Sequence, residues 1–151
     1  MSNYILDLRK TVGHRPLLQV GASVILVNAE GEILLQKRTD NGMWGYHGGS
    51  VELFERVEDA AIRELFEETG LTAEALELLG VFSGPDMAYT YPNGDQVSNV
   101  DVVFVCKRYS GSPVSQVGEV DDLRFFPPDS LPDEISPPNR KALKAYIESL
   151  K

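Results

Sequence analysis

The order of apolar and turn-forming segments predicts an α/β protein with a mixed β-sheet between helices. Two apolar, strand-like segments come first, a helical segment follows, and further strand-like segments precede a closing amphipathic helix. The chain has 151 residues, enough for one domain with a substantial core. Its charged fraction of 25% and hydrophobic fraction of 42% are ordinary for a globular protein, so a single domain over residues 1–151 is expected.

The first third of the chain predicts a helix, a hairpin and a loop. Residues 3–12 can form a short amphipathic helix. The β-branched, apolar segment 18–28 and the segment 32–38 flank a turn at 28–31, so a β-hairpin is expected. Residues 39–54 are rich in Gly, Asn and Asp, which indicates an extended loop.

A central helix is predicted from Arg56 to Thr69. Gly70 suits the left-handed conformation that ends many helices. No Ser, Thr or Asn caps the start of this helix cleanly. The apolar residues expected to seat the helix on the sheet are Ala61, Ile62, Leu65 and Phe66.

The second half of the chain predicts three more strands and a closing helix. Turn-forming residues fill 82–96 and 110–118, and a proline pair ends the last strand. The expected strands are 76–82, 96–109 and 122–126, and the expected helix is 139–150.

Three glutamates crowd one face of the central helix. Glu64, Glu67 and Glu68 are spaced i, i+3, i+4, and like charges at this spacing repel and destabilise a helix. A bound cation would neutralise them, and oxygen-only ligands favour Mg²⁺ or Mn²⁺ over zinc. The alternative is a solvated acidic helix face.

The spacing around these glutamates is specific. Residues 49–71 follow the pattern G-x5-E-x7-R-E-U-x-E-E-x-G-U, in which U is an aliphatic residue. In this pattern the chain resembles the MutT-like Nudix hydrolases. The resemblance implies an α/β/α sandwich, and it implies hydrolysis of a nucleoside diphosphate linked to another moiety.

The resemblance also implies roles for individual residues. The metal ligands would be Glu64, Glu67, Glu68 and the backbone carbonyl of Gly48. Arg63 would orient glutamates, and it can pair with Glu67 or reach back to Glu55. Glu55 would support the site or activate water. A further carboxylate, as metal ligand or general base, is expected from Glu119, with Asp121 and Asp122 as the other candidates. Solvated loop acids and an ordinary helical ion pair are the alternatives.

Residues outside the motif would hold the base and the phosphates. Loop aromatics can stack on a nucleobase, and the candidates are Trp44, Phe82, Tyr89 and Tyr91. Arg38 can bind phosphate, and His47 can contact phosphate or act as an acid or base. The alternatives are a core-anchoring Trp44, a surface salt bridge at Arg38 and a solvated His47.

The net charge of the chain limits the classes of partner that it can bind. A formal net charge of −9 argues against a nucleic-acid polymer or an anionic membrane as the partner. Cys106 is the one cysteine, so no disulfide forms within the chain, and its apolar neighbours indicate a buried thiol. No apolar stretch approaches 18 residues, and a cytoplasmic protein is expected. The expected partner is a small nucleotide, and a homodimer is an option because many relatives are dimers.

Several functions remain open at the level of sequence. An ADP-ribose-like substrate is favoured, with a nucleoside triphosphate or a dinucleoside polyphosphate as alternatives. Pro85 and Tyr89 lie near both of the marks that separate ADP-ribose from diadenosine polyphosphate enzymes, so they do not discriminate. A catalytically silent nucleotide-binding module is another alternative. An isoprenoid diphosphate isomerase would need a cysteine in the cleft, and the apolar surroundings of Cys106 argue against it.

Overall fold

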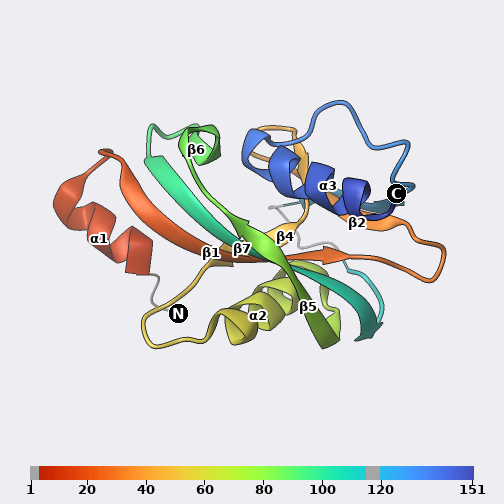
Figure 1. Cartoon of the computed structure of the whole chain (residues 1–151). Coiled ribbons are helices and arrows are strands. Elements are labelled where there is room, and N and C mark those ends of the chain that lie inside the picture. Colours follow the sequence, from red (N-terminus) through yellow and green to blue (C-terminus); the bar gives the residue numbers. More distant parts are fainter. Residues whose placement is uncertain (1–3, 115–119) are drawn as a thin grey trace.

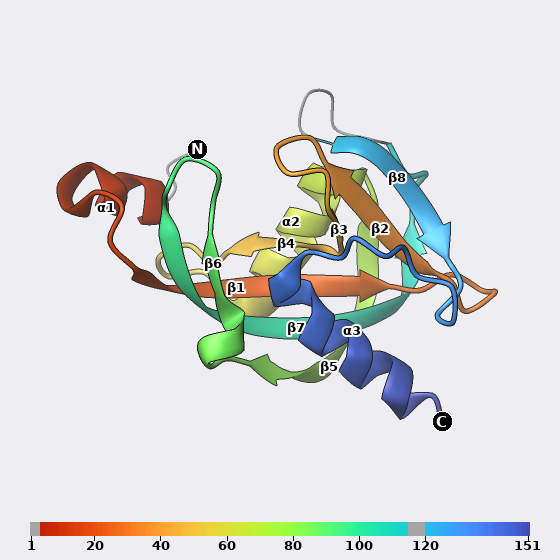
Figure 2. The ribbon, with the colours of Figure 1, turned by 90° about the horizontal axis from the view of Figure 1, so that it is seen from above.

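A computed structural model of the protein describes residues 4–114 and 120–151. In this part of the chain, helices pack on both sides of a β-sheet core (Figure 1, Figure 2). The predicted α/β fold with a mixed sheet between helices is confirmed. In chain order, the elements are α1 (Tyr4–Val12), β1 (Leu17–Leu26), β2 (Ile33–Arg38), β3 (Trp44–Gly45), β4 (His47–Ser50), α2 (Val57–Thr69), β5 (Thr72–Phe82), the 3-10 helix η1 (Pro85–Met87), β6 (Ala88–Thr90), β7 (Gln96–Ser110), β8 (Val120–Phe126) and α3 (Pro137–Ser149).

Strand β1 lies inside the larger sheet, and both of its faces are buried over its second half, from Ala22 to Leu26. It pairs in parallel with β7 and antiparallel with β4. The strand order is β4-β1-β7-β5, and β6 also pairs with β7. Ala22, Val24 and Leu26 share a core cluster with α2, whereas Ile25 and Val27 share another with α3. Since side chains alternate along a strand, this two-sided burial explains the nearly continuous apolar sequence.

The expected hairpin forms only at its turn. The Asn28 N–H donates to the Glu32 carbonyl at 3.0 Å, and a bridge pairs Val27 with Ile33. Beyond this bridge the two strands separate. In the described ranges β1 belongs to the larger sheet, and β2 pairs with β3 and β8 in a second sheet.

The segment 39–54 is not a loop throughout, which corrects the prediction. Strand β3 pairs with β2, and β4 pairs with β1. A Cβ at Gly48 would lie 2.2 Å from Ser23 Oγ and 2.7 Å from the Ala22 carbonyl oxygen. The glycine therefore permits close strand packing. Its low strand propensity is overridden by this tertiary contact.

Helix α2 begins after Arg56 and ends at Gly70, as predicted. Gly70 has a φ of 77°, and its N–H donates to the Phe66 carbonyl at 2.8 Å. The assignment of Phe66 to the buried seat was wrong, because Phe66 is 57% exposed. It follows Ala61 by five residues, which places it about 140° around the helix from that seat. The buried residues of α2 are Ala60, Ala61, Leu65 and Thr69.

Helix α1 is fastened to the sheet by Arg9. The buried Arg9 guanidinium donates to the carbonyls of Gly13, Arg15 and Gln96. Three backbone acceptors on one side chain fix the helix beside the start of β7. No helix in the described part of the chain combines the length and the apolar character needed to cross a bilayer.

Replacing Gly48 with alanine should lower the free energy of unfolding by about 1–3 kcal/mol, the usual penalty for overpacking. The added methyl group would press against the backbone of β1, which cannot rotate away as a flexible side chain would. Urea denaturation measures the change. Gly21→Ala is the milder control, because the nearest atom to its Cβ is Asp101 Oδ1 at 3.3 Å. A Gly48→Ala protein as stable as the wild type would contradict the packing argument.

Candidate active site

Two adjoining cavities lie beside β4 and α2. The larger, about 860 Å³, is here named the carboxylate cleft because Glu64, Glu67 and Glu68 line it. Its remaining walls come from α1, the end of β2, β4 and residues 91–97. The smaller, about 120 Å³, is named the polar pocket. Residues that line both cavities are Gln19, Gln36, Arg38, Gly48, Gly49, Glu68 and Tyr91.

Glu68 lies at the junction of the two cavities. Its Oε1 accepts a hydrogen bond from Gln36 Nε2 at 2.8 Å, and its Oε2 accepts one from the Gly48 N–H at 3.1 Å. Both donors are neutral, and their hydrogen bonds offset only part of the loss of water around the carboxylate. Burial accordingly raises the pKa of Glu68 to about 8, and the nearby charge of Glu64 adds to the effect.

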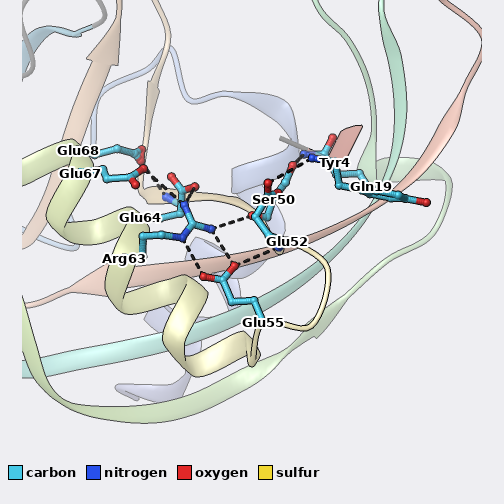
Figure 3. Close-up of polar contacts among 10 residues, drawn as sticks. Tyr4, Gln19, Ser50, Glu52, Glu55, Arg63, Glu64, Glu67 and Glu68 are labelled. Atoms are coloured by element: carbon cyan, nitrogen blue, oxygen red, sulfur yellow. Dashed lines mark hydrogen bonds and ion pairs between the residues drawn. The ribbon is translucent and has the colours of Figure 1, made fainter. Parts of the chain in front are cut away.

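Arg63 connects the other carboxylates (Figure 3). Its Nε and Nη2 donate to the two oxygens of Glu55 at 2.8 and 2.9 Å, which is a bidentate pair. Its Nη1 donates to Glu64 at 2.8 Å and lies 3.5 Å from Glu67, while Nη2 also donates to the Ser50 carbonyl. Both expected contacts of Arg63 are present, and the contact with Glu55 is the shorter.

Gly49 allows Glu64 to lie directly against β4. A Cβ at position 49 would be 2.5 Å from Glu64 Cδ. Burial at this contact raises the pKa of Glu64, and the hydrogen bond from Arg63 opposes the rise. The same guanidinium lowers the pKa of Glu55. The carboxylates of the motif therefore sit in different electrostatic environments.

The atoms available as metal ligands are carboxylate and carbonyl oxygens, and such ligands suit a hard divalent ion. Glu68 is half-buried, is held by two neutral donors and has no salt bridge in the described part of the chain, so a cation would neutralise it. The site is not preassembled, however. No group of three His, Cys, Asp or Glu side chains in residues 4–114 and 120–151 is arranged to hold a metal ion. Arg63 contacts Oε1 of Glu64, which leaves Oε2 of the same carboxylate for an ion.

Three of the predicted substrate residues line the cavities, namely Arg38, Tyr89 and Tyr91. Arg38 lines both, and its Nε and Nη2 donate to Asp40 at 3.0 and 2.8 Å. Tyr89 lines the polar pocket, where its hydroxyl accepts a hydrogen bond from Asn41 at 2.7 Å. Tyr89 and Tyr91 pack edge to face, with ring centroids 4.9 Å apart.

His47 and Trp44 lie elsewhere. The His47 ring has no exposed surface, so as placed it has none to offer a phosphate. Burial lowers its pKa to about 4, which keeps it neutral and unsuited to acid–base work near neutral pH. Trp44 is 9% exposed and belongs to the core cluster on the α3 side, where it packs edge to face on Phe126. The core-anchoring alternative thus describes Trp44.

A further carboxylate was expected from the segment before the last strand, with Glu119 as the first candidate. Glu119 lies outside the described residues, so its prediction remains a prediction. The Asp122 carboxylate pairs with Arg124 and with the Leu123 N–H, and it lines neither cavity. Cys106 is a buried free thiol in β7, as expected.

The polar pocket contains residues that the sequence-based reasoning missed. Asp101 and Tyr46 line it with Asn99 and Asn139. The available signal was an acid inside the apolar segment of β7, because a charged residue is seldom buried without a partner. The asparagines offered no comparable signal.

Comparison with known proteins supports a single assignment. The NUDIX domain family model matches residues 17–146. An ADP-ribose pyrophosphatase of Methanocaldococcus jannaschii is 34% identical over 125 residues, or 81% of this chain and 69% of that protein. A MutT-like protein of Streptomyces ambofaciens is 31% identical over 121 residues, or 80% of this chain and 71% of that protein. The crystal structure of a MutT NUDIX hydrolase from Burkholderia pseudomallei has a TM-score of 0.73 at 33% identity, covering 85% of this chain and 98% of that one.

The family match and the relatives named as pyrophosphatases place the chain among the hydrolases of phosphoric anhydrides. The chain belongs to the Nudix family, and it is a pyrophosphohydrolase of the MutT-like kind. The expectation drawn from the spacing in residues 49–71 is confirmed at this level. Nudix hydrolases generally use divalent metal ions and act on small nucleotides.

The metal-free protein should carry a His47-dependent loss of stability between about pH 6.5 and 4. The pKa of His47 falls from 6.5 to about 4 on folding, so in this window the unfolded chain binds a proton that the folded one does not. Lowering the pH therefore favours unfolding, by on the order of 3 kcal/mol across the window. Urea denaturation at several pH values, with chelator present, compares the wild type with His47→Leu.

The wild type must be compared with a variant because Glu68 changes the pH dependence of stability in the direction opposite to His47. The folded pKa of Glu68, about 8, lies above the ordinary value of 4.5, so the contribution of Glu68 to stability increases as the pH falls through that range. His14→Leu is the matched control, because His14 is exposed and its loss leaves His47 in place. If His47→Leu keeps the full pH dependence of the wild type, the buried histidine is not its source.

Proposed function

We propose that the protein hydrolyses the pyrophosphate bond of a nucleoside diphosphate linked to another moiety, with Mg²⁺ as the cofactor. The observation that supports this most directly is the position of Glu68 between two chemically different cavities. A diphosphate at Glu68 would leave a nucleoside for the polar pocket and a second group for the carboxylate cleft. The ADP-ribose pyrophosphatase among the relatives favours an ADP-ribose-like substrate.

In the proposed mechanism, Glu64, Glu67, Glu68 and the Gly48 carbonyl hold the metal. When bound, Mg²⁺ would screen the phosphate charges and lower the pKa of a coordinated water. The phosphates of the substrate would otherwise face a wall of carboxylates and be repelled.

The residues around the carboxylates would set their geometry. Arg63 restrains Glu64 through a 2.8 Å contact and is itself restrained by the bidentate pair with Glu55. Gln36 and the Gly48 N–H fix both oxygens of Glu68. Glu67 is the least restrained, at 3.5 Å from Arg63 and with 41% of its side chain exposed. Of the three proposed carboxylate ligands it is therefore the one that can reorient most freely toward an ion or a water.

Replacing Glu68 with glutamine should lower kcat by a factor on the order of 10² or more, the effect of removing preorganised electrostatic stabilisation. Glutamine keeps the shape and the hydrogen bond from Gln36 but loses the charge that would bind the metal. Monophosphate release from ADP-ribose, nucleoside triphosphates, dinucleoside polyphosphates, NADH and CDP-alcohols, with and without Mg²⁺, measures activity. Glu58→Gln is the control, because Glu58 is an exposed acid on the same helix.

Two results would contradict the proposal. Turnover near the wild-type rate in Glu68→Gln would remove Glu68 from the metal site. Absence of metal-stimulated hydrolysis across the whole panel would favour a nucleotide-binding module without catalysis.

Replacing Arg63 with lysine should lower kcat by about 10–100-fold, the range found when groups that orient metal ligands are lost. An ammonium cannot make the bidentate pair with Glu55 and reach Glu64 together, so Glu64 would lose its fixed position. The Mg²⁺ concentration for half-maximal rate should rise, while KM for the nucleotide changes little. Arg56→Lys, at the exposed start of α2, is the control. An unchanged Mg²⁺ requirement would show that Arg63 contributes only to stability.

A further inference from the structure

Asp101 is a buried carboxylate at the edge of the polar pocket. It lies on β7, and it is 8% exposed. Its Oδ1 accepts a hydrogen bond from the Ser23 hydroxyl at 2.7 Å, and its Oδ2 accepts one from the Tyr46 hydroxyl at 2.8 Å. No salt bridge in the described part of the chain involves Asp101. This is an unusual state, since a buried charge is normally paired with an opposite one.

The two hydroxyl donors leave Asp101 with unused acceptor capacity. An ionised carboxylate has about four acceptor directions on its two oxygens, and here two are occupied. Tyr46 is also held by Asn139, so its hydroxyl is fixed as a donor to Asp101. The remaining directions can be filled by a ligand with N–H groups that enters the pocket.

The rest of the pocket suits a planar ring with polar edges. Tyr89 and Tyr91 provide aromatic surface, and Asn99 and Asn139 provide amides. The volume of about 120 Å³ is several times the roughly 10–15 Å³ that one water needs, so the pocket has room for a group as large as several waters. Glu68 lines the same pocket, which links it to the proposed position of the phosphates.

We propose that Asp101 is a specificity-determining residue that accepts a hydrogen bond from the exocyclic amino group of the substrate's nucleobase. The inference rests on the proposed function, because it takes the polar pocket as the nucleoside subsite. The carboxylate selects adenine or cytosine over the keto bases hypoxanthine and uracil.

The selection follows from the donor and acceptor pattern of the bases. An exocyclic group projects from the far side of the ring, so it meets the floor of the pocket when the sugar and phosphates point toward Glu68. An amino group at that position donates to Asp101, whereas a keto oxygen faces the carboxylate as a second acceptor. The tight hydroxyl contacts hold Asp101 against rotating away.

The test is direct binding of matched nucleoside monophosphates in the presence of Mg²⁺, measured by isothermal titration calorimetry. AMP is compared with IMP, and CMP with UMP, since each pair exchanges an amino for a keto group and, with it, a bare ring nitrogen for a ring N–H beside that group. The wild type should bind the amino member on the order of tenfold more tightly or better, the usual discrimination of one good base-edge contact. In Asp101→Asn the preference should fall to about twofold or less, because an amide can present either a donor or an acceptor.

Asp129→Asn is the matched control, because it makes the same change in an exposed loop residue and should retain the wild-type preference. Tyr46→Phe is a second variant, which keeps the carboxylate but removes one of its donors. It should weaken the amino preference partly, and it serves if Asp101→Asn does not fold. Circular dichroism melting checks the fold of each variant.

The outcomes separate this inference from the proposed function. Equal affinity of the wild type for both members of each pair, or no binding of any of the four, would overturn the role of Asp101. An unchanged preference in a folded Asp101→Asn would overturn it as well, and would leave Asp101 as a structural link between β1, β7 and Tyr46. A clear amino preference together with no hydrolysis of any nucleotide diphosphate would instead refute the enzymatic proposal alone.

Discussion

The site depends on how closely β4 approaches its two neighbours. A side chain at position 48 would collide with β1, and one at position 49 would collide with Glu64 of α2. Because glycine occupies both positions, the Gly48 N–H reaches Glu68 and the Glu64 carboxylate lies against the strand. The strand is fixed by its ladder to β1, and the helix is fixed by its buried residues. Two well-packed elements therefore determine where the acidic side chains lie.

Some of these glutamates form ion pairs with Arg63, and Glu68 does not. Arg63 compensates Glu55, Glu64 and, more weakly, Glu67 with an internal cation. Glu68 receives only neutral donors, and the pKa of its buried carboxyl is raised to about 8. The chain has a net charge of −9, so it has fewer basic side chains than acidic ones to pair with. Glu68 has no salt bridge in the described residues. An external cation would favour the ionised form of Glu68 and so oppose the rise of its pKa.

The sequence predicted those features of the fold and the site that depend on residues close together in the chain. The bounds of α2 and the left-handed Gly70 follow from helical geometry and residue type, whereas the contact of Arg63 with Glu55, which precedes α2, was an expectation drawn from the motif. Strand β4 could not be predicted in this way, because its partner β1 lies more than twenty residues earlier. The error at His47 has the same origin. In a loop the ring can reach solvent, but as part of β4 His47 pairs with Val24 of β1, and its ring is fully buried.

The two cavities have different proposed roles. The carboxylate cleft holds the reactive groups, and the polar pocket selects the substrate. The proposed reactive groups lie on α2 and β4, whereas Asp101, Ser23 and Tyr46 come from β7, β1 and the residue between β3 and β4. Arg38, at the junction, is already paired with Asp40, so it is only partly available to a phosphate. The protein therefore has little positive charge with which to attract a free diphosphate by itself. Recognition must then come from the polar pocket and from the cation together, which makes a substrate with a nucleoside at one end the best match to the described residues.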